Sequence, residues 1–150
     1  MNKQRLAILI TAGLGGLATF MPWIKAPIIG SVSGTQGDGW ITLMLFAVAI
    51  VLSLMNDRSK MLVGGLRLVA VIPPLIAAAI GIQKIIEFKS KMADLDDNPF
   101  SKALSAAISI DFGLYLLVFA GLLLPVLAFA IKDASGALLT EESIESKEPS

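Results

Sequence analysis

The chain of 150 residues contains no cysteine and no histidine. Their absence excludes disulfide bonds, thiolate nucleophiles, imidazole bases and the usual ligands of zinc, haem and iron–sulfur clusters. Charged residues are also few, at 16% of the chain, against roughly 25% in ordinary soluble domains. The net charge is zero, so the chain lacks the basic excess that is typical of nucleic-acid binding.

Long apolar runs are the most informative feature that is present. Residues 112–131 (FGLYLLVFAGLLLPVLAFAI) carry no charge, and at about 1.5 Å per residue they span the roughly 30 Å hydrocarbon core of a bilayer. Three further apolar segments cover residues 6–24, 40–55 and 61–86. The sequence therefore predicts an all-α integral membrane protein, an antiparallel four-helix transmembrane bundle.

The bundle is expected to occupy residues 1–132, and residues 133–150 form a different kind of segment. This tail carries four glutamates together with serines and a proline. Such a composition buries too little apolar surface to fold by itself. We expect a disordered acidic tail.

The positions of lysine and arginine predict the orientation. Lys3 and Arg5 precede the first span, and Arg58 and Lys60 lie in a short polar turn after the second. Basic residues in short loops are retained on the cytoplasmic side, which predicts that both termini lie in the cytoplasm. Lys3 and Arg5 also resemble the start of a signal peptide, but the apolar run continues through Trp23, and an uncleaved anchor is the expected outcome.

The connection before the second span contains the most distinctive local motif, GTQGDGW at residues 34–40. Its glycines permit a tight turn, and Asp38 can hydrogen-bond its own backbone there. Trp40 suits the headgroup boundary of a bilayer. Asp38 is also a candidate contact for a cation or a partner. A lone carboxylate does not provide the roughly six to eight oxygens that calcium needs, so no metal or cofactor is expected.

Two short motifs carry a resemblance to known proteins: GDGW at residues 37–40 and GLYL at residues 113–116. In these motifs the chain resembles a group of small, largely uncharacterised bacterial four-span membrane proteins. It is also distantly similar to the claudin-type tetraspan layout. The resemblance implies a four-span topology and no activity. The paired cysteines of the claudin first outer loop are missing here, which argues against a paracellular-barrier role.

Charged residues at two further places are candidate contacts. The connection at residues 87–111 is rich in acidic side chains with interleaved lysines, which is typical of a solvated connector but also of a partner surface. The predicted partner-binding residues are Asp38, Trp40, Asp94, Asp96 and Asp97. Arg67 lies near the start of the third span, within reach of the membrane surface, and is predicted to contact a lipid headgroup.

These observations favour a non-enzymatic membrane protein that acts through protein contacts, as an accessory subunit, an assembly factor or an envelope-protection or immunity protein. Its partner is expected to be a membrane protein or a second copy of the chain. The alternative is a small channel or transporter subunit formed by oligomerisation, which requires a polar stripe along a pore. An intramembrane enzyme would require a catalytic pair at depth, and these residues do not supply one.

Overall fold

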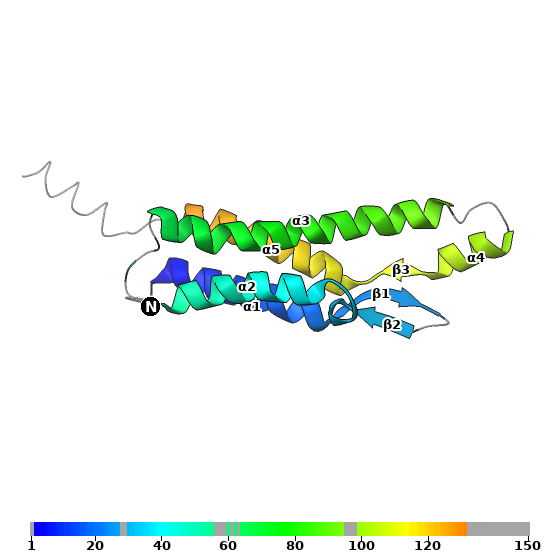
Figure 1. Ribbon diagram of the computed structural model, residues 1–150, viewed down its shortest axis with the longest axis horizontal. Helices are drawn as coiled ribbons and strands as arrows, with labels where there is room; N and C mark the ends of the chain where they lie inside the picture. Colours follow the sequence, from blue (N-terminus) through cyan, green and yellow to red (C-terminus); the bar gives the residue numbers. More distant parts are fainter. Residues whose placement is uncertain are drawn as a thin grey trace, which may run out of the picture.

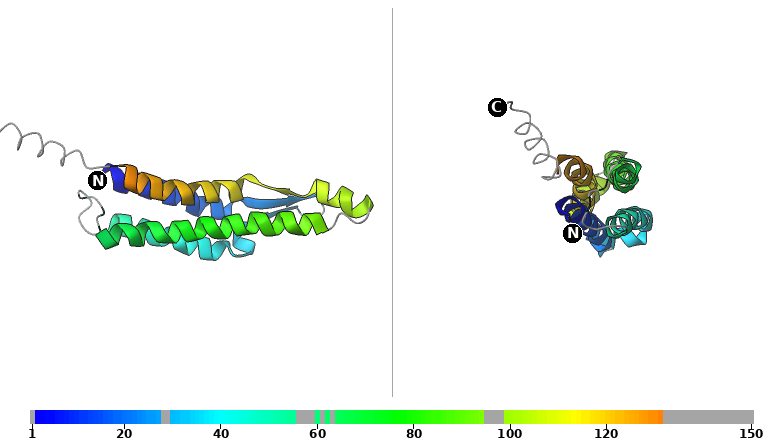
Figure 2. Two further views of the ribbon diagram at one scale, coloured as in Figure 1. Left: turned by 90° about the horizontal axis from the view of Figure 1, so that it is seen from above. Right: turned by 90° about the vertical axis from the view of Figure 1, so that its left-hand side faces the viewer.

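The computed structural model of the protein describes residues 2–27, 30–55, 60, 62, 64–94 and 99–131. Its main body is a bundle of four helices: α1 (Lys3–Phe20), α2 (Gly39–Leu54), α3 (Gly64–Asp94) and α5 (Phe112–Ala130) (Figure 1). Helices α1 and α3 each pack against both α2 and α5. The end-on view in Figure 2 shows these helices side by side around a common axis. The prediction of a mostly helical fold is confirmed.

A three-stranded antiparallel sheet at one end of the bundle shows that the prediction of an all-α fold is wrong in part. Its strands are β1 (Pro22–Ala26), β2 (Gly30–Ser33) and β3 (Ser109–Ile110), in the order β2-β1-β3. The pairing of Ile24 with Ile110 joins the two long connections of the chain. We call this the sheet end of the bundle.

The first helix is shorter than the predicted segment at residues 6–24, because it ends at Phe20. Pro22 disfavours the helical conformation at the residue before it, and Met21 is extended, with φ −75° and ψ 159°. The chain then continues directly into β1. Trp23 therefore belongs to the sheet and not to the first span.

The third helix is longer than the predicted segment at residues 61–86. Helix α3 contains Pro73 and Pro74 and continues to Asp94, so the first part of the expected connection at 87–111 is helical. An amphiphilic helix, α4 (Pro99–Ala107), lies between α3 and β3, at the tip of the molecule farthest from the N-terminus (Figure 1). Charges that the sequence assigned to a loop are therefore held on a helix.

Two of the described helices, α3 and α5, are long and apolar enough to cross a membrane by length and composition, whereas α2 is a shorter apolar helix. Large apolar side chains also point outward from the whole bundle. Examples from the four helices are Leu17, Met44, Ile72 and Phe119, each at least 49% exposed. The buried core between the helices is lined by smaller side chains such as alanine, together with leucines.

Close helix contacts are made at glycines. A Cβ atom at Gly121 of α5 would overlap the Pro74 carbonyl oxygen and the Ala78 side chain of α3. Gly15 of α1 is covered in the same way by the Phe46 ring of α2. Small residues let two helix backbones approach closely, so these glycines set the spacing between neighbouring helices.

Gly121→Ala is expected to separate α3 from α5 and to lower the free energy of unfolding by about 1–3 kcal/mol, the usual cost of overpacking a close contact. Gly13→Ala is the matched control, since a Cβ atom built there meets no atom of a neighbouring helix within 4 Å. Thermal unfolding of both variants in mild detergent measures the difference. Equal melting temperatures would contradict the close contact.

The end of the bundle opposite the sheet is held by two buried polar side chains from the first turn of α1. Arg5 is 2% exposed and donates to the carbonyl oxygens of Met55 and Lys60, both at 2.6 Å, and of Ser53 at 3.3 Å. Gln4 donates to the Ala128 carbonyl and accepts from the Leu62 N–H. The last carbonyls of a helix lack partners within it and carry partial negative charge, so Arg5 satisfies the end of α2.

Arg5→Gln is expected to lower the free energy of unfolding by about 3 kcal/mol, because three charge-assisted hydrogen bonds from one buried guanidinium group are lost together. Lys3→Gln removes a neighbouring exposed charge and is expected to change stability by less than about 0.5 kcal/mol. Denaturant titration in detergent separates the two variants. Similar losses for both would show that Arg5 acts only as a flanking charge.

Candidate functional site

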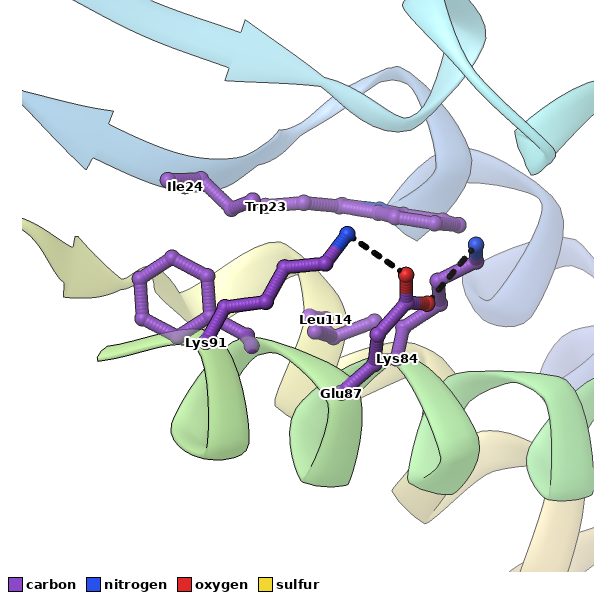
Figure 3. Close-up of a pocket in the computed structure, with 7 residues that line it drawn as sticks. Trp23, Ile24, Lys84, Glu87, Lys91 and Leu114 are labelled. Atoms are coloured by element: carbon purple, nitrogen blue, oxygen red, sulfur yellow. Dashed lines mark hydrogen bonds and ion pairs between the residues drawn. The ribbon is translucent and has the colours of Figure 1, made fainter. Parts of the chain in front are cut away.

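A cavity of about 280 Å³ lies at the sheet end, where β1 faces α3 and the start of α5 (Figure 3). Its lining combines apolar side chains with three charged ones. The lining residues are Trp23, Ile24, Lys84, Glu87, Phe88, Lys91 and Leu114. The cavity is thus amphiphilic, with an indole on one side and a row of charges on the other.

Trp23 is fixed on several sides. Its indole N–H donates to the Ala18 carbonyl at 3.1 Å, and its own carbonyl accepts from the Asp111 N–H at 2.8 Å. The ring is packed so closely against Gly34 that a Cβ atom there would overlap it. Figure 3 shows the indole spread above the side chains of Lys84, Glu87 and Lys91. The aromatic face that borders the cavity is therefore held in one orientation.

Four alternating charges form what we call the ion-pair row: Asp38, Lys84, Glu87 and Lys91. Lys84 Nζ lies 2.6 Å from Asp38 Oδ2 and 3.3 Å from Glu87 Oε2. Lys91 Nζ lies 2.8 Å from Glu87 Oε1. The last three residues lie on one face of α3, at the i, i+3 and i+4 spacing that brings helix side chains together. The row links the start of α2 to α3 and sums to zero charge.

The ion-pair row is exposed to solvent. Its side chains are between 36% and 69% exposed. Exposed pairs of this kind contribute little to stability, because water and salt screen them. The row is therefore a weak structural element whose charges can exchange partners at little cost.

A further ion pair ties the sheet to the start of α5. Lys25 Nζ lies 2.9 Å from Asp111 Oδ2, and the other oxygen of Asp111 accepts from the Phe112 N–H at 2.8 Å. The hydrogen bond from Lys25, followed by the bond from the Phe112 backbone, holds the pKa of Asp111 below its ordinary value of 3.8. The stabilisation is therefore complete above that value and is lost as the pH falls through the lowered pKa.

The structure brings only one of the predicted partner-binding residues into this site. Asp38 joins the ion-pair row. Trp40 is 54% exposed on the first turn of α2, and Asp94 is exposed at the end of α3. Asp96 and Asp97 lie outside the described residues, as does the predicted tail at residues 133–150.

Arg67, the predicted lipid contact, lies on the first turns of α3, at the end opposite the sheet. Its Nε donates to the Leu62 carbonyl at 2.8 Å, and its guanidinium carbon lies 5.4 Å from the centre of the Phe129 ring. Such stacking is a favourable cation–π contact. Arg67 is partly exposed and is far from the cavity at the sheet end.

Sequence reasoning missed Trp23, Lys84 and Lys91 as parts of one site. A signal was present, since residues 84, 87, 88 and 91 follow the i, i+3, i+4, i+7 pattern of one helix face. The pattern becomes visible only when the third helix is extended past Ile86. Trp23 gave no such signal, because it directly follows a long apolar segment and could not be distinguished from the rest of the predicted first span.

Three buried hydroxyl groups inside the bundle, those of Thr19, Thr42 and Ser53, are bonded to carbonyls of their own helices. Thr42 donates to the Gly39 carbonyl at 2.8 Å and Ser53 donates to the Ala49 carbonyl at 2.8 Å. Thr19 lies 3.5 Å from Thr42 and donates to the Gly15 carbonyl. Across the residues that the structure describes, no group of three or more His, Cys, Asp or Glu side chains could hold a metal ion.

Comparison with known proteins gives no matching protein family, no similar curated protein and no matching solved structure.

Lys25→Gln is expected to raise the pKa of Asp111 toward 3.8, because the largest cause of its lowering is removed while the Phe112 N–H remains. Carboxyl ¹³C NMR across an acid titration measures the change. Lys102→Gln removes an exposed lysine of α4 and is expected to leave the titration unchanged. An unaltered Asp111 titration in Lys25→Gln would show that the ion pair does not form.

Proposed function

We propose that the chain is a four-span protein of a bacterial inner membrane, with both termini in the cytoplasm, and that it acts without catalysis by binding another membrane protein. The apolar length of α3 and α5 and the exposed apolar side chains on all four helices support the membrane location. In this orientation the sheet end faces away from the cytoplasm. The cluster of Lys3, Arg5 and Arg67 at the opposite end agrees with the distribution of basic residues on cytoplasmic faces.

One observation carries the proposal: the connection between α1 and α2 and the connection between α3 and α5 are held together as one folded structure. Antiparallel helices need only about 2–8 residues to connect them. Here the two connections are instead joined by β1–β3 pairing and by the Lys25–Asp111 ion pair. We call β1, β2, β3 and α4 the outer platform. A folded platform on otherwise plain helices favours recognition of a partner.

The interior of the bundle supports a contact protein over a channel subunit. The hydroxyl groups of Thr42 and Ser53 are bonded to carbonyls of α2, and so they do not line a polar path. The side chains packed between the helices are otherwise mainly apolar. A pore lining needs polar groups that face a common channel.

Phe100 is the best candidate for the centre of the partner contact. It is 78% exposed on the first turn of α4, more than the other large apolar side chains among the described residues. Helix α4 lies at the tip of the molecule, beyond the sheet, and away from the rest of the bundle (Figure 1). Exposed aromatic side chains commonly dominate binding energies at protein interfaces. Exposed Asp94 at the end of α3 adds a charge beside this contact in the proposal, and Trp40 anchors α2 at the membrane surface.

The test replaces Phe100 with the photo-crosslinking residue p-benzoylphenylalanine in living cells. The same replacement at Phe119, 61% exposed in the middle of α5, is the matched control that faces lipid. We expect illumination to give one discrete protein adduct from position 100 and none from position 119. Phe100→Ala is expected to reduce co-purification of the same partner at least tenfold, while Phe119→Ala leaves it unchanged.

Two outcomes would contradict the proposal. Adducts at position 119 that have twice the mass of the chain would indicate a homo-oligomer built through the helices, and solute flux into liposomes containing the pure protein would then establish the channel alternative. Recovery of the protein from the soluble fraction would overturn the membrane location itself.

A further inference from the structure

We infer that the cavity at the sheet end binds the headgroup of a zwitterionic phospholipid that carries a primary ammonium group, of the phosphoethanolamine type. The inference depends on the proposed membrane location, and it is independent of the protein partner. Its basis is the position of the cavity, the balance of its charges and the fixed face of Trp23.

The cavity lies at the level where the bundle meets its outer platform. Gly81 of α3 packs beside Leu114 and Leu117, on the first turns of α5. The part of α3 from Lys84 to Asp94 therefore projects past the start of α5, by about 15 Å at 1.5 Å per residue. The end of α1 adjoins the start of α5 at the same level, since a Cβ atom at Gly113 would overlap Met21 and the Pro22 carbonyl oxygen. In the proposed orientation this level is the headgroup layer of the outer leaflet.

The size of the cavity suits a headgroup. Its volume of about 280 Å³ lies just below the roughly 300–1,000 Å³ that is typical of small-molecule sites. A whole lipid does not fit in this space, whereas a headgroup does. Ile24, Phe88 and Leu114 provide an apolar wall against which the glycerol end and the first carbons of an acyl chain can lie.

The balance of charges selects a zwitterion over an anion. Lys84 and Lys91 both contact the Glu87 carboxylate, and the ion-pair row sums to zero. A purely anionic group that recruits Lys91 leaves Glu87 without one of its two cationic partners. A group with both signs gives Glu87 and Lys91 one new partner each: its ammonium takes the place of Lys91 on Glu87, and its phosphate accepts from the displaced Lys91.

The indole of Trp23 favours an ammonium at this position. Figure 3 places the Glu87 carboxylate and the two lysine ammonium groups below the indole. A cation near an aromatic face is attracted by the electron density of the ring, most strongly for tryptophan. The indole cannot turn away, because its N–H is bonded to Ala18. A ligand ammonium therefore meets a carboxylate on one side and an aromatic face on the other.

The test is native mass spectrometry of the full chain, titrated with phosphatidylethanolamine, phosphatidylglycerol or phosphatidylcholine of identical acyl chains. We expect a first phosphatidylethanolamine adduct that forms at least tenfold more tightly than the other two. Emission from Trp23 in the Trp40→Phe background, where it is the sole tryptophan, is expected to shift with the same midpoint and so to locate the adduct at the cavity.

Three variants assign the charges. Glu87→Gln is expected to abolish the preference for phosphatidylethanolamine. Lys91→Gln is expected to weaken the first phosphatidylethanolamine adduct about fivefold. The matched control is Lys89→Gln, which removes an exposed lysine from the same helix that does not line the cavity, and it is expected to change neither.

Several outcomes would overturn the inference. Equal or tighter binding of phosphatidylglycerol would indicate an anion site, and a preference that survives Glu87→Gln would place the lipid elsewhere. A shift of Trp23 emission by inorganic phosphate alone would indicate a free phosphate site. If no lipid preference is found while the protein still fractionates with membranes and crosslinks at position 100, the lipid site fails and the proposed function stands.

Discussion

The arrangement of the whole sheet end depends on how Trp23 is held. Its indole N–H donates to the Ala18 carbonyl near the end of α1, and its ring packs on Gly34, which precedes α2. Its backbone carbonyl accepts a hydrogen bond from the N–H of Asp111, just before α5. Tryptophan suits this position because it combines a large apolar surface with a single hydrogen-bond donor. One residue thus determines how three helix ends and the sheet are placed relative to one another, and it also provides one wall of the cavity.

The two ends of the bundle are tied by different means from its middle. At both ends, side chains such as Trp23 and Arg5 bond to backbone carbonyls near helix termini. Between the ends, helices contact through glycine and alanine, as at Gly121 and Ala78. Apolar contacts have little directional preference, whereas hydrogen bonds to helix ends have a defined geometry. The polar ties therefore set how far each helix is shifted along its neighbour, and the small residues set how close it lies.

Much of the helical fold could be predicted from the sequence because uncharged runs are a strong and local signal. The sheet could not, because β3 has two residues and is defined by pairing with Ile24, more than eighty positions earlier. The second half of α3 was misjudged for another reason. Its Lys, Glu, Met and Ala residues are good helix formers, but the charges of its lysines and acidic residues suggested a loop. Arg5 was recognised as a charge and not as a buried donor, since burial depends on helices that follow it in the chain. Of the candidate site, Asp38 was anticipated from its place in a glycine-rich turn, whereas Glu87 and Lys91 were anticipated only as parts of the charged connection at residues 87–111.

The pairing of β1 with β3 also constrains the order in which the molecule can be completed. Strand β1 directly follows α1, whereas β3 and α5, which pack against β1 and α1, are the last of the described elements to be made. During synthesis the surface of α1 and β1 that contacts β3 and α5 therefore stays uncovered until almost all of the described chain has been made. A chaperone, an insertion factor or a neighbouring helix has access to that surface in the interval, and it loses that access when α5 arrives.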